Sequence, residues 1–548
     1  MKISKIIAVV MSGVITVSML ASCGKQEVQT DGDTKNVTLK FLDCWQGETA
    51  PKDLDTNPVA KAIKEKTGIT LQTEFTNVDE IQKLNLVFAS GDMPDIISAP
   101  FWGGNDAATV LIKKAAAEGM LLPLDEYMHL APSLGDVFTQ GLAVDFKEQD
   151  IDAADGNHYI MPSQIPATTE DVANNAECIY VRQDILDALG VDPQKDINTS
   201  EDLYQLAKRI KSGSFTDIND KPVIPISTWH SGQLMHMLYA SYVSYENFFS
   251  GYSNIDGQII DNNFTPRMDQ QILFMRKLMS EGLFDVEAST HNTARAKEKL
   301  VTGSVAIIPS PYSWMKDALQ NSLYETNPEM KYVPIAPLIN ADNERGMSKL
   351  KGAGGAPVIL ISKTCKDPES VFALLEFLNS DEGEQLLRYG VIGTHSEMVD
   401  GKPRLTDEWL AKYKEDPKSL INEGINSIYT RFLVKDRRMS HFGEFSPGEA
   451  LEQDADYEFA KTQAPIVNLL EGFRIFYFEY DYPEISKIYS LKPHSKILET
   501  QQRAYYADSD EAALKIYNDF RQQLLDGGMA DLHSFITDKA KTRTDLIY

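Results

Sequence analysis

The chain has 548 residues, a length that corresponds to two large lobes or to three or four domains of roughly 150 residues each. Hydrophobic residues make up 43% and charged residues 24%, a balance typical of a globular protein rather than a disordered one. The net charge of −27 argues against a nucleic-acid partner, because such a surface repels phosphates, and four cysteines exclude a disulfide scaffold.

The N-terminal segment has the pattern of an export signal. Lys2 and Lys5 precede the apolar stretch 6–21, which is shorter than the roughly 20 apolar residues that a membrane-spanning helix needs. The end of this stretch overlaps Leu20-Ala21-Ser22-Cys23, which resembles the lipobox of bacterial lipoproteins. We therefore expect residues 1–22 to be a cleaved signal peptide and Cys23 to carry lipid, including palmitate. An uncleaved anchor and an ordinary secretory signal are the alternatives.

The residues after the lipobox predict a tethered body. Residues 23–36 are polar and contain almost no apolar side chain, so they are expected to form a flexible tether. No later stretch contains the run of roughly 18 apolar residues that indicates a membrane span, so the body is expected to be held at the outer face of the cell membrane by its lipid. The other cysteines lie in apolar settings and are expected to be buried free thiols: Cys44, Cys178 and Cys365.

The first part of the body alternates strands and helices. Residues 37–41 alternate apolar and polar side chains, which predicts a strand. Asn57-Pro58 has the composition of a helix start, and Gly68 marks the end of that helix. Residues 69–75 alternate again, so the strand–helix–strand unit predicts two parallel strands.

Further elements extend this α/β pattern. A second helix is expected from about residue 78 to 91, and a short third strand at 94–98, which together indicate an α/β lobe of doubly wound type. Other helices are expected after Thr199, after Asp367 and from about Asp508 to Gly527.

Several short segments, in order along the chain, carry a family pattern: FASGDMPDII at 88–97, LPLDEY at 122–127, DGNHYIMP at 155–162, VTGSVAI at 301–307, NSDEG at 379–383 and YGVIGTH at 389–395. They resemble the family 1 extracellular solute-binding proteins, the sugar-binding lipoproteins of ABC importers, and most of all the long, oligosaccharide-associated members from Gram-positive bacteria. Ser304 stands where the family has Lys, and Ser396 where it often has Tyr. Each piece is short, and their shared order carries the assignment.

The resemblance implies an α/β, periplasmic-binding-protein-like fold of type II, with two α/β lobes and a ligand cleft at the hinge. By family analogy the first lobe covers 37–162 plus 352–395, and the second covers 163–351 plus 396–548 with the C-terminal helices. The implied partners are a carbohydrate ligand and the permease subunits of an ABC transporter. The receptor is expected to be a monomer.

Two loops are compared with the calcium loops that some relatives possess. The stretch 217–222 lacks the glycine of such loops and contains Lys221 and Pro222, and the stretch 150–156 has Ala154 where a ligand is required. We therefore expect neither a metal nor a cofactor.

The chemistry of sugars selects candidate binding residues. Aromatic rings cover the C–H faces of a sugar, and planar amides or carboxylates bind its hydroxyls. In open α/β sheets, ligands bind beyond the carboxyl ends of the strands. The residues selected in this way follow the first strand, the third strand and the apolar stretch 223–226: Trp45, Gln46 and Glu48; Trp102 and Asn105; and Trp229 with His230.

Another candidate comes from the resemblance, because the family tends to place an aromatic about ten residues after the glycine that corresponds to Gly303. This position falls between Tyr312 and Trp314, so both are candidates. A core role is the alternative for every tryptophan, above all for Trp229, which has apolar neighbours. We expect Trp409 and His395 to be structural.

No catalytic residue is predicted. The sequence contains no Gly-x-Ser-x-Gly, His-Glu-x-x-His, Cys-x-x-Cys or P-loop motif. Among 80 acidic residues some carboxylate pairs at glycosidase spacing arise by chance, so they carry no weight. The expected function is a lipid-anchored receptor that captures an oligosaccharide by lobe closure. A lipoprotein that binds peptides or another small solute is the alternative, followed by a surface glycan-degrading enzyme.

Overall fold

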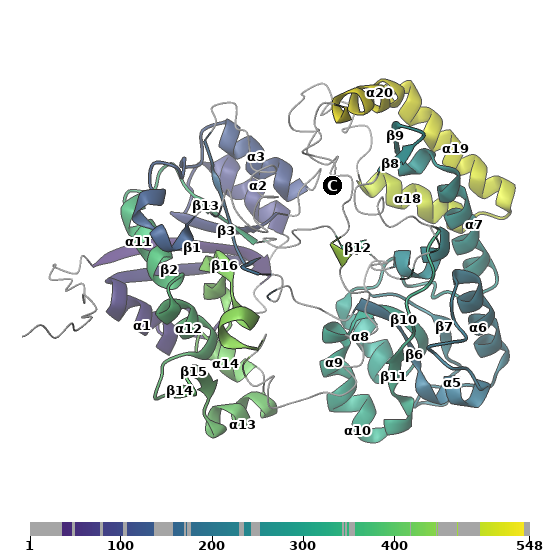
Figure 1. Ribbon diagram of the computed structural model, residues 1–548, viewed down its shortest axis with the longest axis horizontal. Helices are drawn as coiled ribbons and strands as arrows, with labels where there is room; N and C mark the ends of the chain where they lie inside the picture. Colours follow the sequence, from purple (N-terminus) through teal and green to yellow (C-terminus); the bar gives the residue numbers. More distant parts are fainter. Residues whose placement is uncertain are drawn as a thin grey trace, which may run out of the picture. The chain divides into compact units, whose positions relative to one another are not determined.

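The computed structural model describes residues 36–541 apart from internal gaps, the longest of which cover 138–156, 243–251, 350–356 and nearly all of 445–493 (Figure 1). The predicted signal peptide, Cys23 and the tether up to Lys35 lie outside the described residues. The described residues form two α/β cores, each built around its own sheet.

The first core surrounds a five-stranded sheet with the order β2-β1-β3-β13-β4. Strands β1, β2 and β3 run parallel to one another, whereas β13 is antiparallel to both β3 and β4. All residues of β3 and β13 are buried, as expected for central strands covered on both faces. The strands are β1 (Val37–Gln46), β2 (Ile69–Thr76), β3 (Ile96–Pro100), β4 (Ile160–Pro162) and β13 (Pro357–Ile361).

Helix α1 begins and ends where the sequence predicts. In α1 the Asn57 side chain accepts a hydrogen bond from the Ala60 amide, and Gly68 ends the helix with a φ of 71°, a conformation that glycine adopts without strain. The predicted parallel pairing of β1 and β2 around this helix is confirmed. The helices are α1 (Pro58–Thr67), α2 (Glu80–Ser90), α3 (Ala107–Ala117), α11 (Pro368–Leu378) and α12 (Asp381–Tyr389).

The segment 396–436 packs in the first core, whereas the family analogy assigned it to the second lobe. Its elements are the hairpin β14 (Ser396–Val399) and β15 (Lys402–Leu405), the helices α13 (Asp407–Glu415) and α14 (Lys418–Asn422), and β16 (Lys435–Asp436). Two contacts over long sequence separations explain this placement. The Phe432 ring lies 4.7 Å from that of Phe41 between centroids. β16 pairs with β5 (Ile165–Pro166), and Ile165 belongs to the first core although the family analogy assigned it to the second lobe.

The second core surrounds a four-stranded sheet with the order β11-β6-β10-β7. β10 runs parallel to β7 and antiparallel to β6, which also pairs antiparallel with β11. The strands are β6 (Glu177–Arg182), β7 (Ile224–Ile226), β10 (Val305–Pro311) and β11 (Tyr332–Pro334). Every residue of β10 is buried.

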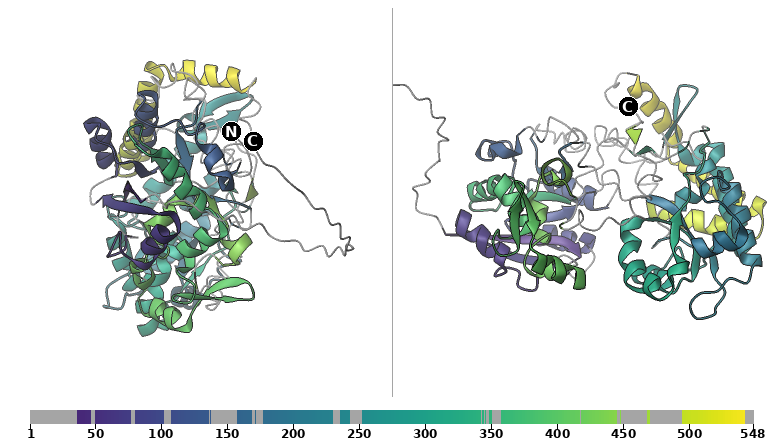
Figure 2. Two further views of the ribbon diagram at one scale, coloured as in Figure 1. Left: turned by 90° about the vertical axis from the view of Figure 1, so that its left-hand side faces the viewer. Right: turned by 60° about the horizontal axis from the view of Figure 1, so that its bottom comes forward.

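Helices from distant parts of the chain cover this second sheet. The C-terminal helices pack against α7 and against the hairpin of β8 and β9, where the yellow ribbons lie beside teal ones in Figure 2. The elements are α5 (Gln183–Leu189), α6 (Ser200–Ser212), β8 (Tyr252–Ile255), β9 (Gln258–Asp261), α7 (Pro266–Ser280), α8 (Thr293–Val301), α9 (Tyr312–Ala318), α10 (Tyr324–Thr326), α18 (His494–Tyr505), α19 (Asp510–Asp526) and α20 (Met529–Ala540). Two short strands, β12 (Ser348–Lys349) and β17 (Asn468–Leu469), pair with each other.

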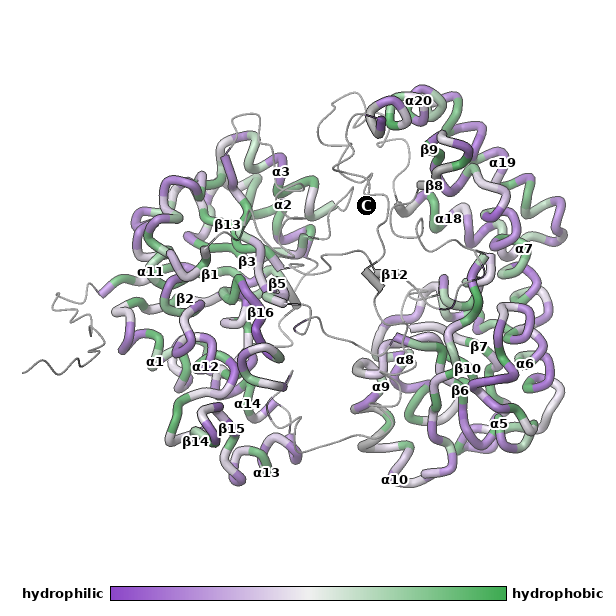
Figure 3. Tube along the Cα trace, viewed as in Figure 1, coloured by the Kyte–Doolittle hydropathy of each residue, from purple (hydrophilic) through white to green (hydrophobic). Residues whose placement is uncertain are grey.

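Hydropathy follows these cores. The central strands β1, β3 and β10 are largely apolar, and the surrounding helices alternate apolar and polar residues (Figure 3). The free cysteines Cys44, Cys178 and Cys365 are buried, which confirms that prediction. Among the described residues, no helix is both long and apolar enough to span a membrane.

Candidate functional site

Two tryptophans meet at the carboxyl edge of the second sheet. Trp229 follows β7 and Trp314 lies in the first turn of α9, directly after β10. Because β7 and β10 are parallel neighbours, their carboxyl ends lie at the same edge of the sheet. The ring centroids are 5.5 Å apart and the planes are inclined by 41°. We call these two residues the tryptophan pair.

The members of the tryptophan pair differ in exposure. Trp229 is 3% exposed, whereas Trp314 is 38% exposed. The buried ring therefore supports the exposed one, which presents apolar surface to solvent at a strand end. An aromatic surface held in this way can cover the C–H face of a sugar ring.

The structure separates the two aromatic candidates that follow Gly303. Tyr312 is 1% exposed, and its ring packs 5.9 Å from that of Tyr180. Trp314, two residues further on, is the exposed aromatic of this stretch. Trp314 is therefore the better placed of the two to contact a ligand.

In the first core, the candidate residues follow neighbouring parallel strands. Trp45 and Gln46 end β1, and β3 ends at Pro100, just before Trp102. The register pairs Asp43 with Ser98, so both carboxyl ends lie at one edge of the sheet. The side chains of Trp45 and Gln46, and the whole of Glu48, Trp102, Asn105 and His230, lie outside the described residues, so their ligand contacts remain predictions.

A buried charge that the sequence did not predict lies at this same edge. Asp43 is fully buried two residues before Trp45, and its Oδ1 lies 3.7 Å from Nε of Arg431. Burial lowers the pKa of Arg431, and the charge of Asp43 partly opposes this effect. An arginine within the otherwise apolar run 431–434 was the available signal, although nothing in the sequence names its partner.

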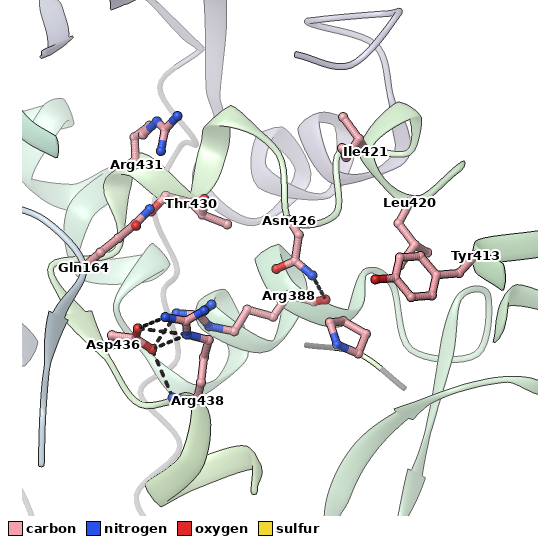
Figure 4. Close-up of a pocket in the computed structure, with 11 residues that line it drawn as sticks. Gln164, Arg388, Tyr413, Leu420, Ile421, Asn426, Thr430, Arg431, Asp436 and Arg438 are labelled. Atoms are coloured by element: carbon pink, nitrogen blue, oxygen red, sulfur yellow. Dashed lines mark hydrogen bonds and ion pairs between the residues drawn. The ribbon is translucent and has the colours of Figure 1, made fainter. Parts of the chain in front are cut away.

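Arg431 also lines a pocket of about 360 Å³ in the first core (Figure 4). Arg388 and Arg438 converge on Asp436, with Arg388 Nη2 at 3.1 Å from Oδ1 and Arg438 Nη2 at 2.6 Å from Oδ2. In Figure 4 the Tyr413 and Leu420 side chains lie well away from this charged group, so the lining has a polar part and an apolar part. The lining residues are Gln164, Arg388, Tyr413, Leu420, Ile421, Asn426, Thr430, Arg431, Asp436, Arg438 and Pro447.

Two residues of this pocket have an unusual backbone conformation. Gln164 has a φ of 57° and Asn426 a φ of 47°, and a side chain in this left-handed region costs roughly 1 kcal/mol. The Gln164 amide donates to the Leu433 carbonyl at 2.6 Å, which holds it in place. Such strain is concentrated at ligand sites in many proteins, and here it occurs twice in one pocket lining.

The carboxylates in and near this pocket are engaged by arginines. Within the pocket lining, the oxygens of Asp436 are held by two guanidinium groups. Glu384, behind the pocket, is likewise engaged by Arg388 and Arg437 at 3.0 and 2.7 Å. These ion pairs engage the carboxylate oxygens, and the guanidinium and amide groups of the lining are hydrogen-bond donors.

The loop compared with calcium sites uses its carboxylate internally. Asp217 accepts hydrogen bonds from the amides of Asn219 and Lys221 and from the Ser304 hydroxyl, at 2.8, 2.9 and 3.2 Å. Burial tends to raise the pKa of Asp217, but these hydrogen bonds outweigh it and lower the pKa. Within the described part of the chain, no group of three or more His, Cys, Asp or Glu side chains is arranged to hold a metal ion.

Comparison with known proteins agrees with this architecture. The model of the bacterial extracellular solute-binding protein family matches residues 50–385, more than half of the chain. The chain is 24% identical over 296 residues to the fructooligosaccharide ABC transporter substrate-binding protein FusA of Streptococcus pneumoniae, a match that covers 50% of this chain and 52% of FusA. It is also 24% identical over 467 residues to lipoprotein LipO of Bacillus subtilis, covering 80% of this chain and 85% of LipO.

Solved structures extend the similarity over nearly the whole chain. FusA of S. pneumoniae in complex with kestose superposes with a TM-score of 0.67 and 17% identity, covering 93% of this chain and 99% of FusA. The alginate-binding protein AlgQ2 gives a TM-score of 0.64 and 18% identity, with 92% and 98% of the two chains covered. The chain therefore belongs to the bacterial extracellular solute-binding proteins and has their periplasmic-binding-protein-like α/β fold.

Proposed function

We propose that this protein captures an oligosaccharide outside the cell and delivers it to the permease of an ABC transporter. The observation that carries the proposal is the tryptophan pair, in which buried Trp229 supports the exposed ring of Trp314 at the carboxyl edge of a parallel strand pair. The names of FusA and AlgQ2, which refer to fructooligosaccharide and alginate, support carbohydrate as the ligand class.

Capture is proposed to occur by closure of two lobes around the sugar. A ligand shifts a protein toward its closed form only if it binds that form more tightly, so the sugar has to contact both lobes. The second lobe would contribute Trp314, and the first lobe would contribute the residues at the ends of β1 and β3, Trp45 and Trp102 among them. The protein performs no chemistry on the sugar in this proposal.

The lipid anchor is a separate part of the proposal. The lipobox-like end of the signal supports attachment through Cys23 at the outer face of the cell membrane, and similarity to LipO, itself named a lipoprotein, supports it further. Metabolic labelling with an alkyne fatty acid tests it, because the native chain should be labelled and the Cys23→Ala variant should not. Labelling of both the native chain and the Cys23→Ala variant would show that the lipid is attached at another residue.

A glycan library measured by thermal shift tests the main proposal. A ligand at 100 times its Kd adds about 2.7 kcal/mol to the free energy of unfolding. At least one oligosaccharide should raise Tm and give saturable binding by calorimetry. The same preparation is also screened against a peptide library and assayed for new reducing ends. Stabilisation by peptides alone would favour the peptide-binding alternative, and turnover of a glycan would contradict a non-enzymatic receptor.

A further inference from the structure

A buried charged cluster lies behind the tryptophan pair. Asp285, His291 and Lys299 are 4%, 6% and 4% exposed. Lys299 belongs to α8, and the other two precede that helix in the chain. None of the three is exposed enough to form a ligand-binding surface, and their side chains instead bind neighbouring backbone and side chains. We call them the Asp285 cluster.

His291 binds the backbone that carries Trp229. Its Nε2 lies 3.1 Å from the carbonyl oxygens of both Thr228 and Trp229. A carbonyl oxygen only accepts, so Nε2 carries the hydrogen. Nδ1 lies 3.4 Å from Nζ of Lys299, whose ammonium group only donates, so Nδ1 is the acceptor. His291 therefore directs its Nε2 hydrogen at the backbone of Thr228 and Trp229.

The other two members fix His291 and the start of the same loop. Nζ of Lys299 lies 2.5 Å from Oδ2 of Asp285 and 2.8 Å from Oε2 of Glu287. Oδ2 of Asp285 also accepts from the Ser227 hydroxyl at 2.6 Å. The cluster therefore holds Ser227, Thr228 and Trp229 in succession after the end of β7.

We infer that Asp285, His291 and Lys299 are positioning residues that fix the tryptophan pair and thereby determine how tightly a sugar ring stacks on Trp314. The inference rests on the proposed function. Stability alone does not account for the cluster, because replacing buried ion pairs by well-packed apolar side chains is often neutral or stabilising. A rigid backbone under Trp229 gives the charged groups a role that apolar residues would not fill, since only hydrogen-bond donors can hold two carbonyl groups.

Fluorescence of the full chain tests this without any ligand. In a background of Trp45→Phe, Trp102→Phe and Trp409→Phe, the emission reports only the tryptophan pair. His291→Ala should increase quenching by acrylamide, and His291→Gln, whose amide can donate to the same carbonyls, should restore most of the protection. The matched control is His533→Ala, which removes a hydrogen bond of 3.1 Å from the Asp261 amide to an α20 histidine in the same core and should leave quenching unchanged.

Binding in chains that keep all five tryptophans provides the second readout. For the oligosaccharide that binds most tightly in the glycan library, His291→Ala should weaken the affinity about tenfold, in the range of measured couplings between contacting residues. In a Trp314→Ala background the same substitution should have little further effect, because its influence is exerted through that ring. If His291→Ala does not fold, Ser227→Ala, which removes only the hydroxyl bound to Asp285, should show a smaller loss in the same direction.

Three results would overturn the inference: unchanged quenching in His291→Ala, an equal change in His533→Ala, or the same loss of affinity with and without Trp314. If no oligosaccharide binds the native chain, the proposed function fails, and the quenching comparison still decides whether the cluster positions the tryptophan pair.

Discussion

Exposure separates the aromatic side chains that the sequence makes equally plausible as ligand contacts. Tyr312 and Trp314 are two residues apart, yet one belongs to the core and the other presents a ring to solvent. Trp409, expected to be structural, packs 4.8 Å from the fully buried His395 and carries the Lys412 ammonium 4.0 Å above its ring. A sequence gives the position of an aromatic residue relative to a strand end, but the helix that follows decides which side chain points outward.

Replacing Trp314 by alanine should weaken oligosaccharide binding by about 1–3 kcal/mol, because an exposed stacking surface is lost. Calorimetry measures the affinity, and a cooperative thermal unfolding transition should show that the variant is still folded. Trp409→Ala is the control, expected to lower Tm and leave affinity unchanged. Trp102→Ala is predicted to weaken binding by a similar amount through the first lobe. Unchanged affinity in Trp314→Ala would remove that residue from the site.

The three buried thiols should be unreactive toward alkylating reagents in the native protein. Burial raises the pKa of Cys178 to about 12 and that of Cys365 to about 11, and it raises the pKa of Cys44 as well. The reactive thiolate is therefore scarce near neutral pH. Iodoacetamide at pH 8 should leave all three unmodified in the native chain and alkylate all three in urea, as mass spectrometry would show. Alkylation of Cys44 without unfolding would contradict this.

At the level of elements, local signals were sufficient wherever a helix end is formed by neighbouring residues. Asn57 and Gly68 mark the start and the end of α1, as the sequence predicts. Thr199 and Asp202 form a complete capping box at the start of α6, where the sequence also predicts a helix. The sequence does not predict which segments pair over long sequence separations. The β5–β16 ladder joins residues 165–166 to 435–436, and the Asp43–Arg431 contact is equally distant. Hydrophobic patterns show that such segments are buried, but not against what.

Asp171 links two segments that lie far apart in the sequence. Its fully buried carboxylate accepts from the amides of Met439 and Ser440 at 2.9 and 2.8 Å and from the hydroxyls of Ser440 and Thr168 at 2.7 and 2.8 Å. Burial tends to raise the pKa of Asp171, but these hydrogen bonds outweigh it, so the pKa lies below its usual value. The carboxylate therefore stabilises the fold above the unfolded-state pKa of about 4, and this stabilisation is lost as the pH falls through the lower folded-state pKa.

Asp171→Asn should lower the free energy of unfolding by about 2 kcal/mol at pH 7, the contribution of hydrogen bonds to a charged group. The difference from the native chain should shrink as the pH falls below about 4. Urea unfolding at pH 7 and pH 3 measures both values. Asp538→Asn, at an exposed residue beside Lys541, is the control and should change little at either pH. An equal deficit at both pH values would show that the charge of Asp171 is not involved.

For the whole molecule, the resemblance predicted the fold class, and the comparisons confirm it, but the path of the chain between the cores differs from the expected one. The family analogy placed all of 396–548 in the second lobe. Leu405, Leu420 and Phe432 instead belong to the first core, whereas the helices α18–α20 contribute to the second. The described residues of this segment belong to the first core up to Val434 and to the second core from Ala504 onward, and no motif in the sequence predicts this division.

Deleting residues 494–548 should unfold the second core. The deletion removes four large side chains that are at most 3% exposed, and burying each stabilises by about 2 kcal/mol: Tyr517, Phe520, Leu524 and Ile536. Their sum is comparable to the whole stability of a typical domain. Limited proteolysis with mass spectrometry should find new cleavage sites within 177–345. A chain ending at Lys541 is the control, and equal resistance of both chains would contradict the prediction.

The position of β13 in the middle of the first sheet constrains when the first core can fold during synthesis. Strand β13 lies between β3 and β4, yet it is translated long after both, and the residues that finish this core extend to Val434. A nascent chain that has reached β4 still has an open sheet edge with unpaired backbone groups, which is a hazard for association with other chains. The second core closes later still, with α20. Chaperones that hold the chain unfolded are therefore expected to be needed through most of synthesis. Fragments of the N-terminal half are expected to aggregate rather than fold.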